Sequence, residues 1–363
     1  MRRSVAAVLV LATGMLISAS GAAPAQQGAR LSSPRALLVE KGKIYKFAQD
    51  RTTIAWVGPK YWLHVQQLST HKTWHLGHLE PSVRAGYRSG PRALVVEGKR
   101  VAWMNYGGVM THEAAISTRA PGEPKATLVD AYGYADATNE GMYFGGLAAD
   151  ANTLAYGDAA VYCQPKYRCF SDRQEYVVSG GGVHRSTGLK TYPQRIQGIP
   201  APVAIALSEG RLAVIPADTS ASTTAAPHPA PNGPVGVYDL AGRPVTTVVP
   251  VGTAREVALA WPTLAVLVQQ SDGATAIERY DARNGALIDR TQAAGASQLA
   301  IGSGGTVFLV GSTIYTLRSG LAQILWRPQG KPIGLSVEGR RVAWAVNIGE
   351  RGRIVTLELP RSP

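Results

Sequence analysis

The sequence has little of what the common kinds of active site require. Its 363 residues include only two cysteines, which together would fill half of a tetrahedral metal site. It holds no G-x-S-x-G elbow, no H-E-x-x-H pair and no Gly-rich phosphate loop. The formal net charge is +13, yet there is no run of five or more like charges. Nucleic-acid binding is therefore not expected, since it usually needs a dense basic patch.

An apolar run near the N-terminus is too short to cross a membrane. It extends from Ser4 to Ala19, below the roughly 20 residues that a spanning helix needs. Arg2 and Arg3 precede it, and Ala23-Pro24-Ala25 follows it with the A-x-A spacing of a cleavage site. Residues 1–25 are predicted to be a Sec-type signal peptide cleaved after Ala25. The alternative is an uncleaved membrane anchor. The expected location is secreted or in the cell envelope, periplasmic or extracellular.

The mature chain would carry 35 basic and 24 acidic residues. Such a surplus suits an anionic ligand, for example a wall polymer or a lipid headgroup. The alternative is that arginines are simply scattered over the surface. In an oxidising compartment the nearby Cys163 and Cys169 are predicted to form a local disulfide.

A short apolar triplet recurs seven times along the chain. Its middle residues are separated by 47, 53, 58, 52, 43 and 35 residues, a mean of 48, which is typical of β-propeller blades. The triplets begin at Ile54, Val101, Leu154, Leu212, Leu264, Val307 and Val342.

Two copies of the repeat are nearly identical over a longer stretch. Ala93–Trp103 and Gly334–Trp344 match at eight of eleven positions, and Ile205–Val214 is a weaker copy. Each has an apolar run, a Glu-Gly pair and a second apolar run, which predicts a hairpin with glycine in its turn. The small alanine of the triplet allows close packing of sheets, and Trp103 and Trp344 are expected to fill space between blades.

The hairpins carry a family resemblance. Ala48–Trp56 and Leu207–Ala213 are similar to the S-P-D-G-x-x-I-A-F core of the WD40-like (PD40) repeats in TolB-type propellers. This chain replaces the Pro-Asp of that core, usually by Val-Glu or Ser-Glu. The resemblance implies a propeller fold and a binding role. It supplies no catalytic residue and no cofactor.

We therefore predict an all-β single domain over 26–363, with seven four-stranded blades. The last blade would lack a fourth strand, which Ala36–Val39 can supply, so that no sheet edge stays open. Six or eight blades are the alternatives, because Pro34–Glu40 nearly repeats Pro91–Glu97 and would then begin a blade of its own.

Three segments exceed what the fold needs, and function concentrates in such loops. They are Asp130–Tyr143, Gly157–Gln174 and Pro216–Pro234, the last predicted to be disordered over about 216–234. We expect them on one face with Asn232, where rings and carboxylates would bind a protein or glycan. The alternative is that the tyrosines fill loop cores. The ligand-face candidates are Tyr132, Tyr134, Asp136, Glu140, Tyr143, Tyr162 and Tyr167.

Basic residues precede several predicted inner strands. Arg92, Arg255 and Lys331 would surround a channel mouth and attract an anion, or they are ordinary turn residues. No metal site is predicted, because the calcium-like segment Asp136–Gly141 lacks two of its ligands.

The predicted function is an exported, non-catalytic propeller that binds a protein or an envelope glycan. No cofactor, no nucleic acid and no integral membrane segment in the mature chain are expected. The alternative is a secreted enzyme that acts on polysaccharide or peptide through loop carboxylates such as Asp136, Glu140 and Asp172.

Overall fold

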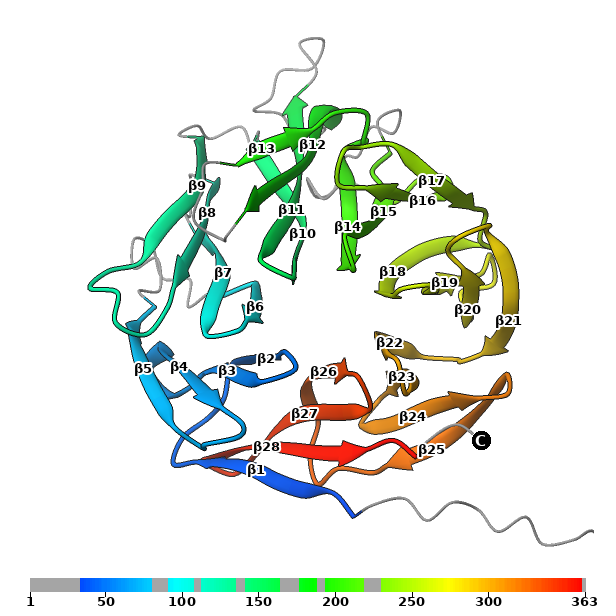
Figure 1. The fold of residues 1–363 in the computed structure, drawn as a ribbon. Coiled ribbons are helices and arrows are strands. Elements are labelled where there is room, and N and C mark those ends of the chain that lie inside the picture. The colour runs from blue at the N-terminus through cyan, green and yellow to red at the C-terminus, as the bar shows by residue number, and fades with distance from the viewer. Residues whose placement is uncertain are drawn as a thin grey trace, which may run out of the picture. The chain divides into compact units, whose positions relative to one another are not determined.

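The computed structural model is a seven-bladed β-propeller, as the repeat predicts (Figure 1). It describes residues 33–79, 91–107, 112–134, 141–163, 176–187, 193–218 and 230–360. Each blade is a four-stranded antiparallel sheet, and the blades are arranged around a central axis (Figure 1). Within these residues no helix is long and apolar enough to cross a membrane.

The strands follow one another from the axis outward in blades 1 to 6. Blade 1 has β2 (Lys46–Gln49), β3 (Thr53–Val57), β4 (Trp62–Gln67) and β5 (Thr73–His78), with the short 3-10 helix η1 (Pro59–Tyr61) before β4. Blade 2 has β6 (Ala93–Glu97), β7 (Arg100–Gly107), β8 (His112–Arg119) and β9 (Thr127–Tyr134). Blade 3 has β10 (Gly141–Asp150), β11 (Thr153–Cys163), β12 (Tyr176–Thr187) and β13 (Gln194–Ile196).

The next three blades repeat the pattern. Blade 4 has β14 (Pro202–Ser208), β15 (Arg211–Pro216), β16 (Val235–Asp239) and β17 (Pro244–Val248). Blade 5 has β18 (Thr253–Ala260), β19 (Thr263–Gln269), β20 (Thr275–Asp281) and β21 (Ala286–Gln292). Blade 6 has β22 (Ala296–Gly302), β23 (Gly305–Val310), β24 (Thr313–Arg318) and β25 (Leu321–Trp326).

Blade 7 is made from both ends of the chain. It has β26 (Pro332–Glu338), β27 (Arg341–Ile348) and β28 (Arg351–Glu358), and its outer strand is β1 (Arg35–Glu40). β1 pairs antiparallel with β28, with a bulge between Ala36 and Leu38. The predicted closure by an N-terminal strand is therefore confirmed, and the count is seven rather than six or eight.

The triplets form the second strand of each blade and are the centre of the core. Their alanines have almost no exposed surface, for example Ala55 and Ala343. Each apolar cluster is shared by two neighbouring blades: Trp103 packs with blade 1 residues such as Val57, and Trp344 packs with Val307 of blade 6. Each sheet is thus stabilised by its neighbours, as repeat architectures require.

Candidate functional site

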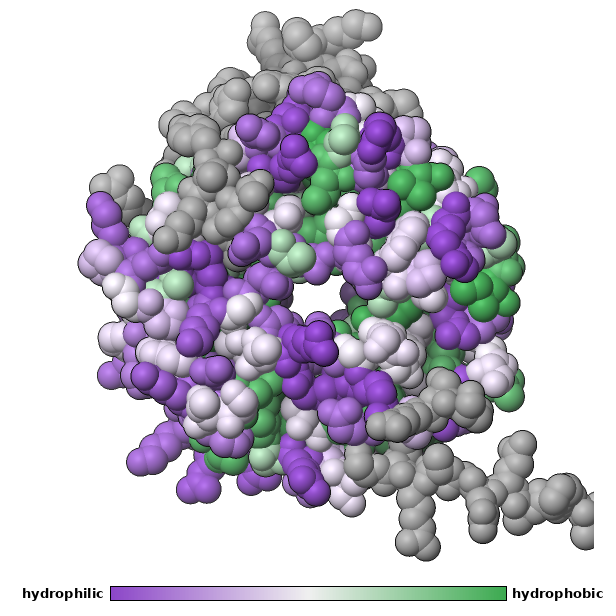
Figure 2. All heavy atoms as spheres, viewed as in Figure 1, coloured by the Kyte–Doolittle hydropathy of each residue, from purple (hydrophilic) through white to green (hydrophobic). Residues whose placement is uncertain are grey.

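The turns that join the first and second strands of all seven blades meet around one end of the axis. Each inner strand ends there, and together the turns line a cavity of about 900 Å³. Figure 2 shows a central opening in the ring bordered largely by hydrophilic residues. The cavity is a candidate binding site, because it is concave and receives side chains from every blade.

Carboxylates occupy these turns in five consecutive blades. We name this set the acidic arc, and it consists of Glu338 (blade 7), Asp50 (blade 1), Glu97 (blade 2), Asp150 (blade 3) and Glu209 (blade 4). Blades 5 and 6 complete the ring with uncharged residues, chiefly Ala260, Trp261, Gly302 and Ser303. The cavity therefore has a charged side and an uncharged side.

Asp50 is the most buried member of the acidic arc, with 9% of its surface exposed. Its Oδ1 accepts hydrogen bonds from the backbone N–H groups of Thr52 (2.6 Å) and Thr53 (2.7 Å). Its Oδ2 has almost no exposed surface, and the backbone N–H of Gly98, in the neighbouring blade, also favours the charged form of this carboxyl group.

Three members of the acidic arc hold their protons more tightly than isolated carboxyl groups do. Burial raises the pKa of Glu97 to about 7, helped by the negative charges of Asp50, Asp150 and Glu338. Burial likewise raises the pKa of Glu338, and Asp50 adds to that rise. Burial also raises the pKa of Asp50. Glu97 therefore changes charge close to neutral pH, and a nearby cation would favour its ionised form.

Two of the arginines that line the cavity are held by the blades themselves. Arg340 Nε donates to the backbone carbonyl of Leu359 (2.8 Å), and Arg341 Nε donates to Gln49 Oε1 (2.9 Å). The lining arginines, which include Arg51, all come from blades 7 and 1. The part of the acidic arc in blades 2 to 4 has no lining arginine beside it.

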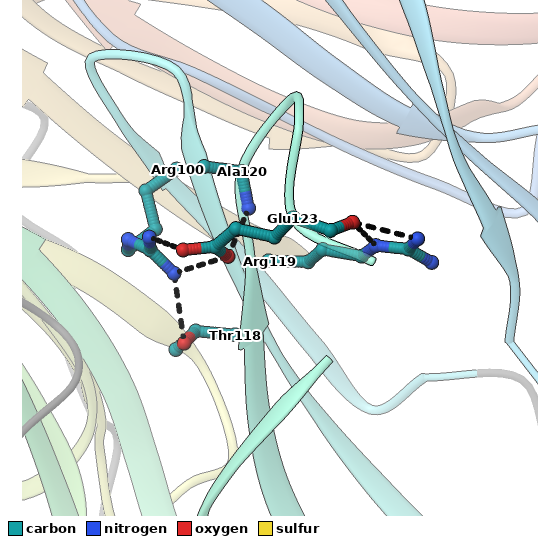
Figure 3. Close-up of polar contacts among 5 residues, drawn as sticks. All are labelled: Arg100, Thr118, Arg119, Ala120 and Glu123. Carbon is teal, nitrogen blue, oxygen red and sulfur yellow. Dashed lines mark hydrogen bonds and ion pairs between the residues drawn. The ribbon is translucent and has the colours of Figure 1, made fainter. Parts of the chain in front are cut away.

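Glu123, an acidic residue farther from the axis, is paired with an arginine. Figure 3 shows Glu123 in the β8–β9 turn. Both terminal nitrogens of Arg100 donate hydrogen bonds to its carboxylate. The Ala120 N–H donates to the same carboxylate (2.8 Å), and Arg119 donates to the Glu123 carbonyl. By contrast, the charges that act on Glu97 are those of other carboxylates, whereas the charges of Arg341 and Arg51 favour the ionised form of Glu338.

The basic residues predicted to surround a channel mouth lie at the other end of the channel. Since every inner strand ends at the cavity, every inner strand begins at the opposite end. Arg92 directly precedes β6, Lys331 directly precedes β26, and Arg255 is the third residue of β18. All three are exposed, and Arg255 Nε donates to Gln269 Oε1 (2.9 Å). Their anion-binding role stays a prediction.

Four of the predicted ligand-face tyrosines lie on strands rather than in loops. Tyr132 and Tyr134 belong to β9, Tyr143 to β10 and Tyr162 to β11. The segments Asp130–Tyr143 and Gly157–Gln174 were predicted to be irregular. Tyrosine, however, has a strong preference for strands, and the strands continue through these tyrosines. The other candidates (Asp136, Glu140 and Tyr167, with Asp172 of the enzyme alternative) lie outside the described residues.

The insertion of blade 4 is closed at its base. Ala217 forms a bridge with Pro231, and the Asn232 N–H donates to the Pro216 carbonyl (2.9 Å). Asn232 also lines a small cavity of about 260 Å³ beside the exposed Val249.

Cys163 is the last residue of β11, whereas Cys169 lies outside the described residues. Their disulfide therefore stays a prediction.

A second carboxyl group with a raised pKa lies in the wall of the ring. Glu256 is on β18, the inner strand of blade 5, and its side chain is turned towards blade 6. Burial raises its pKa to about 7, although a hydrogen bond from the Leu299 N–H favours its charged form. Glu256 does not line the cavity of the acidic arc.

Two observations on the described residues bear on the chemistry of the cavity. Among them, no three histidine, cysteine, aspartate or glutamate side chains come together closely enough to hold a metal ion. The described lining of the cavity includes no histidine or cysteine that a carboxylate could activate. The Ser208 hydroxyl instead accepts a hydrogen bond from the Trp261 N–H (3.2 Å) and links blades 4 and 5.

Sequence reasoning missed the acidic arc although its signal was visible. Glu97, Glu209 and Glu338 belong to the Glu-Gly pairs of the three hairpin copies, which were read only as turns. An acidic residue that recurs at one position of a propeller repeat must recur around the axis. With that rule, the alignment of the repeats would have predicted that these glutamates lie together around the axis.

Comparison with known proteins supports the fold alone. No family model matches the chain, and no curated protein matches its sequence. The chain is similar to the computationally designed Ika8 protein, with a TM-score of 0.50 and 14% identity over 90% of this chain and 98% of that one.

Two natural structures give similar values. A chain of the mitotic checkpoint complex has a TM-score of 0.50 and 14% identity over 98% of this chain and 99% of that one. BamB from Moraxella catarrhalis has a TM-score of 0.46 and 12% identity over 87% and 85%. At such identities a likeness extends to the fold alone.

Proposed function

We propose that this chain is an exported, non-catalytic propeller that binds a protein or a cell-envelope glycan, and that its repeats are of the TolB-type, WD40-like kind. The observation that carries the binding role is the 900 Å³ cavity lined by every blade. The seven blades hold the backbone around such a site in place. Binding a ligand therefore requires little further loss of backbone conformational entropy. The predicted signal peptide supports export.

The binding role is tested by photo-crosslinking in cells that express the full chain. A photoreactive residue at Ser303, on the rim of the cavity, should give a specific adduct, whereas one at the exposed Ala322 on outer strand β25 should not. A third probe at Asn232 reports on the opposite, loop-bearing face. Loss of the adduct on protease treatment identifies a protein, and loss on glycosidase treatment identifies a glycan.

Two outcomes would contradict the proposal. Equal crosslinking from Ser303 and Ala322 would mean that the cavity meets no specific partner. An adduct from Asn232 alone would move the binding site to the face with the long segments. Export is tested separately, since N-terminal sequencing of the protein from the envelope fraction should begin at Gln26.

A further inference from the structure

The end of the ring opposite the cavity carries a different charge. Every inner strand begins at this end, so the connections between blades and the turns between second and third strands lie here. We name as the basal face these segments of blades 5, 6, 7 and 1, which are residues 41–45, 58–61, 249–252, 270–274, 293–295, 311–312, 327–331 and 349–350. They hold five lysines and arginines but only two acidic residues, Asp272 and Glu350. The basal face is therefore positively charged.

Most cations of the basal face are not paired with acids of the chain. Lys60, Arg327 and Lys331 are exposed, and none of them forms an ion pair with another described residue. Lys43 does pair with Glu350, at 3.2 Å between Nζ and Oε1. In and beside the turns at the cavity end, by contrast, arginines pair with acids: Arg243 with Asp239, Arg283 with Asp281 and Arg100 with Glu123. The basal face thus keeps cations available for an anionic partner.

Exposed aromatic and aliphatic side chains accompany these cations. Trp62 begins β4, Trp326 ends β25 and Tyr45 directly precedes β2, and between 41% and 42% of each residue is exposed. Tryptophans of the triplets, such as Trp344, are instead buried in the core. Three aliphatic residues at the basal end are also exposed: Val249, Val251 and Ile348. Exposed apolar side chains gathered with charged ones on one face are typical of an interaction surface.

We propose that the basal face binds the surface of a bilayer that contains anionic lipid. Its lysines and arginines would contact the lipid headgroups, and its tryptophans and tyrosine would enter the interfacial layer. The proposal goes beyond the proposed function, which concerns the cavity. A chain bound in this way presents the cavity on the side away from the lipid, where it stays open to a partner.

The combination of side chains favours a bilayer over other anionic partners. Each lysine or arginine near an anionic bilayer strengthens binding, and tryptophan and tyrosine prefer the boundary between headgroups and acyl chains. A soluble polyanion would use the cations but would leave Trp62 and Trp326 without a role. A protein partner usually covers a surface from which lysine is depleted. The basal face also comes from four consecutive blades that end at one side of the ring, so its residues can meet a flat surface together.

The test is co-sedimentation of the purified full chain with vesicles at physiological ionic strength. One set of vesicles contains phosphatidylglycerol and phosphatidylcholine in equal parts, and the other contains phosphatidylcholine alone. The charge variant combines Lys60→Gln, Arg327→Gln and Lys331→Gln. The matched control combines Arg35→Gln, Lys99→Gln and Lys125→Gln, which removes the same charge from exposed positions at the cavity end. All proteins share the same N-terminal segment, so that segment cannot cause a difference between them.

We expect the wild type to bind the anionic vesicles and to bind the neutral ones at least about tenfold more weakly. The charge variant should bind the anionic vesicles at least about tenfold more weakly than the wild type, because one basic residue near such a surface changes binding about fivefold. The control should stay within about twofold, since charges more than about 8 Å from the lipid are largely screened. Circular dichroism and the melting temperature confirm that the variants are folded.

A second pair of variants tests the aromatic contribution. Trp62→Ala with Trp326→Ala should weaken binding to anionic vesicles at least about fivefold, because apolar surface that enters the interface is lost. The matched control is Leu128→Ala with Leu321→Ala, which removes exposed apolar side chains at the cavity end of β9 and β25 and should change binding less than about twofold.

Three results would overturn the inference. They are no preference for anionic vesicles, an equal loss in a variant and its control, or a loss in the charge variant with none in the tryptophan variant. The last result would indicate a soluble polyanion instead of a bilayer. The Ser303 crosslink reports on the opposite end of the ring, so either proposal can fail while the other stands.

Discussion

Replacing Glu256 by glutamine should stabilise the protein at neutral and alkaline pH. The carboxyl group is in the wall of blade 5, where burial raises its pKa to about 7. Glutamine has the same shape and keeps an oxygen that can accept the hydrogen bond from the Leu299 N–H. The substitution therefore removes the burial of a charge while it retains the main polar contact.

The magnitude follows from the pKa. An unfolded Glu256 ionises around pH 4.5, whereas the folded one keeps its proton until about pH 7. Because the folded pKa is raised, the wild type has its full stability below pH 4.5 and loses it as the pH rises through 7. A difference of that size corresponds to about 3 kcal/mol. The variant should thus gain about 3 kcal/mol over the wild type above pH 7 and nothing below pH 4.5.

Thermal unfolding of both proteins between pH 4 and pH 8.5 measures this difference. For a chain of this size the gain corresponds to a melting temperature about 4–6 °C higher at pH 8. Any cost of placing the amide itself is the same at every pH, so the change with pH isolates the charge. A difference that is constant from pH 4 to pH 8.5, or that shrinks as the pH rises, would refute the reasoning. Glu350→Gln, on an exposed turn, should show no such change.

Three further predictions concern stability. Arg100→Ala leaves the carboxylate of Glu123 without its main partner and should lower the free energy of unfolding by about 2 kcal/mol, measured in urea; an unchanged midpoint would contradict this. Deleting residues 33–40 removes the outer strand of blade 7 and should abolish cooperative unfolding or cause association, seen by circular dichroism and gel filtration; a monomer with the wild-type midpoint would contradict it. If Cys163 and Cys169 are paired, the oxidised protein has no free thiol in a thiol assay, and reduction should lower its stability by about 2 kcal/mol; two titratable thiols would exclude the disulfide.

Much of the fold could be predicted because the repeat is local. The triplets and Glu-Gly hairpins depend on neighbours within one blade, and the structure has them as second strands and first turns. The ambiguous segment was Pro34–Glu40, which resembles Pro91–Glu97. The first becomes an outer strand with exposed residues, and the second becomes an inner strand that is largely covered. These similar sequences thus become different strands of their blades, because only blade 7 lacks a fourth strand of its own. That property belongs to the whole ring and cannot be read from either segment.

The site was harder to predict because it exists only once the ring is closed. Glu97 and Glu338 are far apart in the sequence, and each hairpin on its own explains its glutamate as part of a turn. What the sequence could not supply was the convergence of seven turns on one axis. The length of the three long segments led instead to the prediction of a ligand face made of tyrosines. Of these, Tyr132 and Tyr134 lie on β9.

The closure of blade 7 also determines when the ring can be completed during synthesis and folding. Asn347 exchanges two hydrogen bonds with the backbone of Ile44, at 2.9 and 3.0 Å, across 303 positions of the chain. The segment that carries β1 is synthesised before every blade, and its partner β28 is synthesised after all the others. During synthesis, and during any passage through a translocation pore, the ring stays open and cannot become trapped as a finished propeller. Contacts between such distant segments are slow to form, so the ring cannot be completed before β28 has been made.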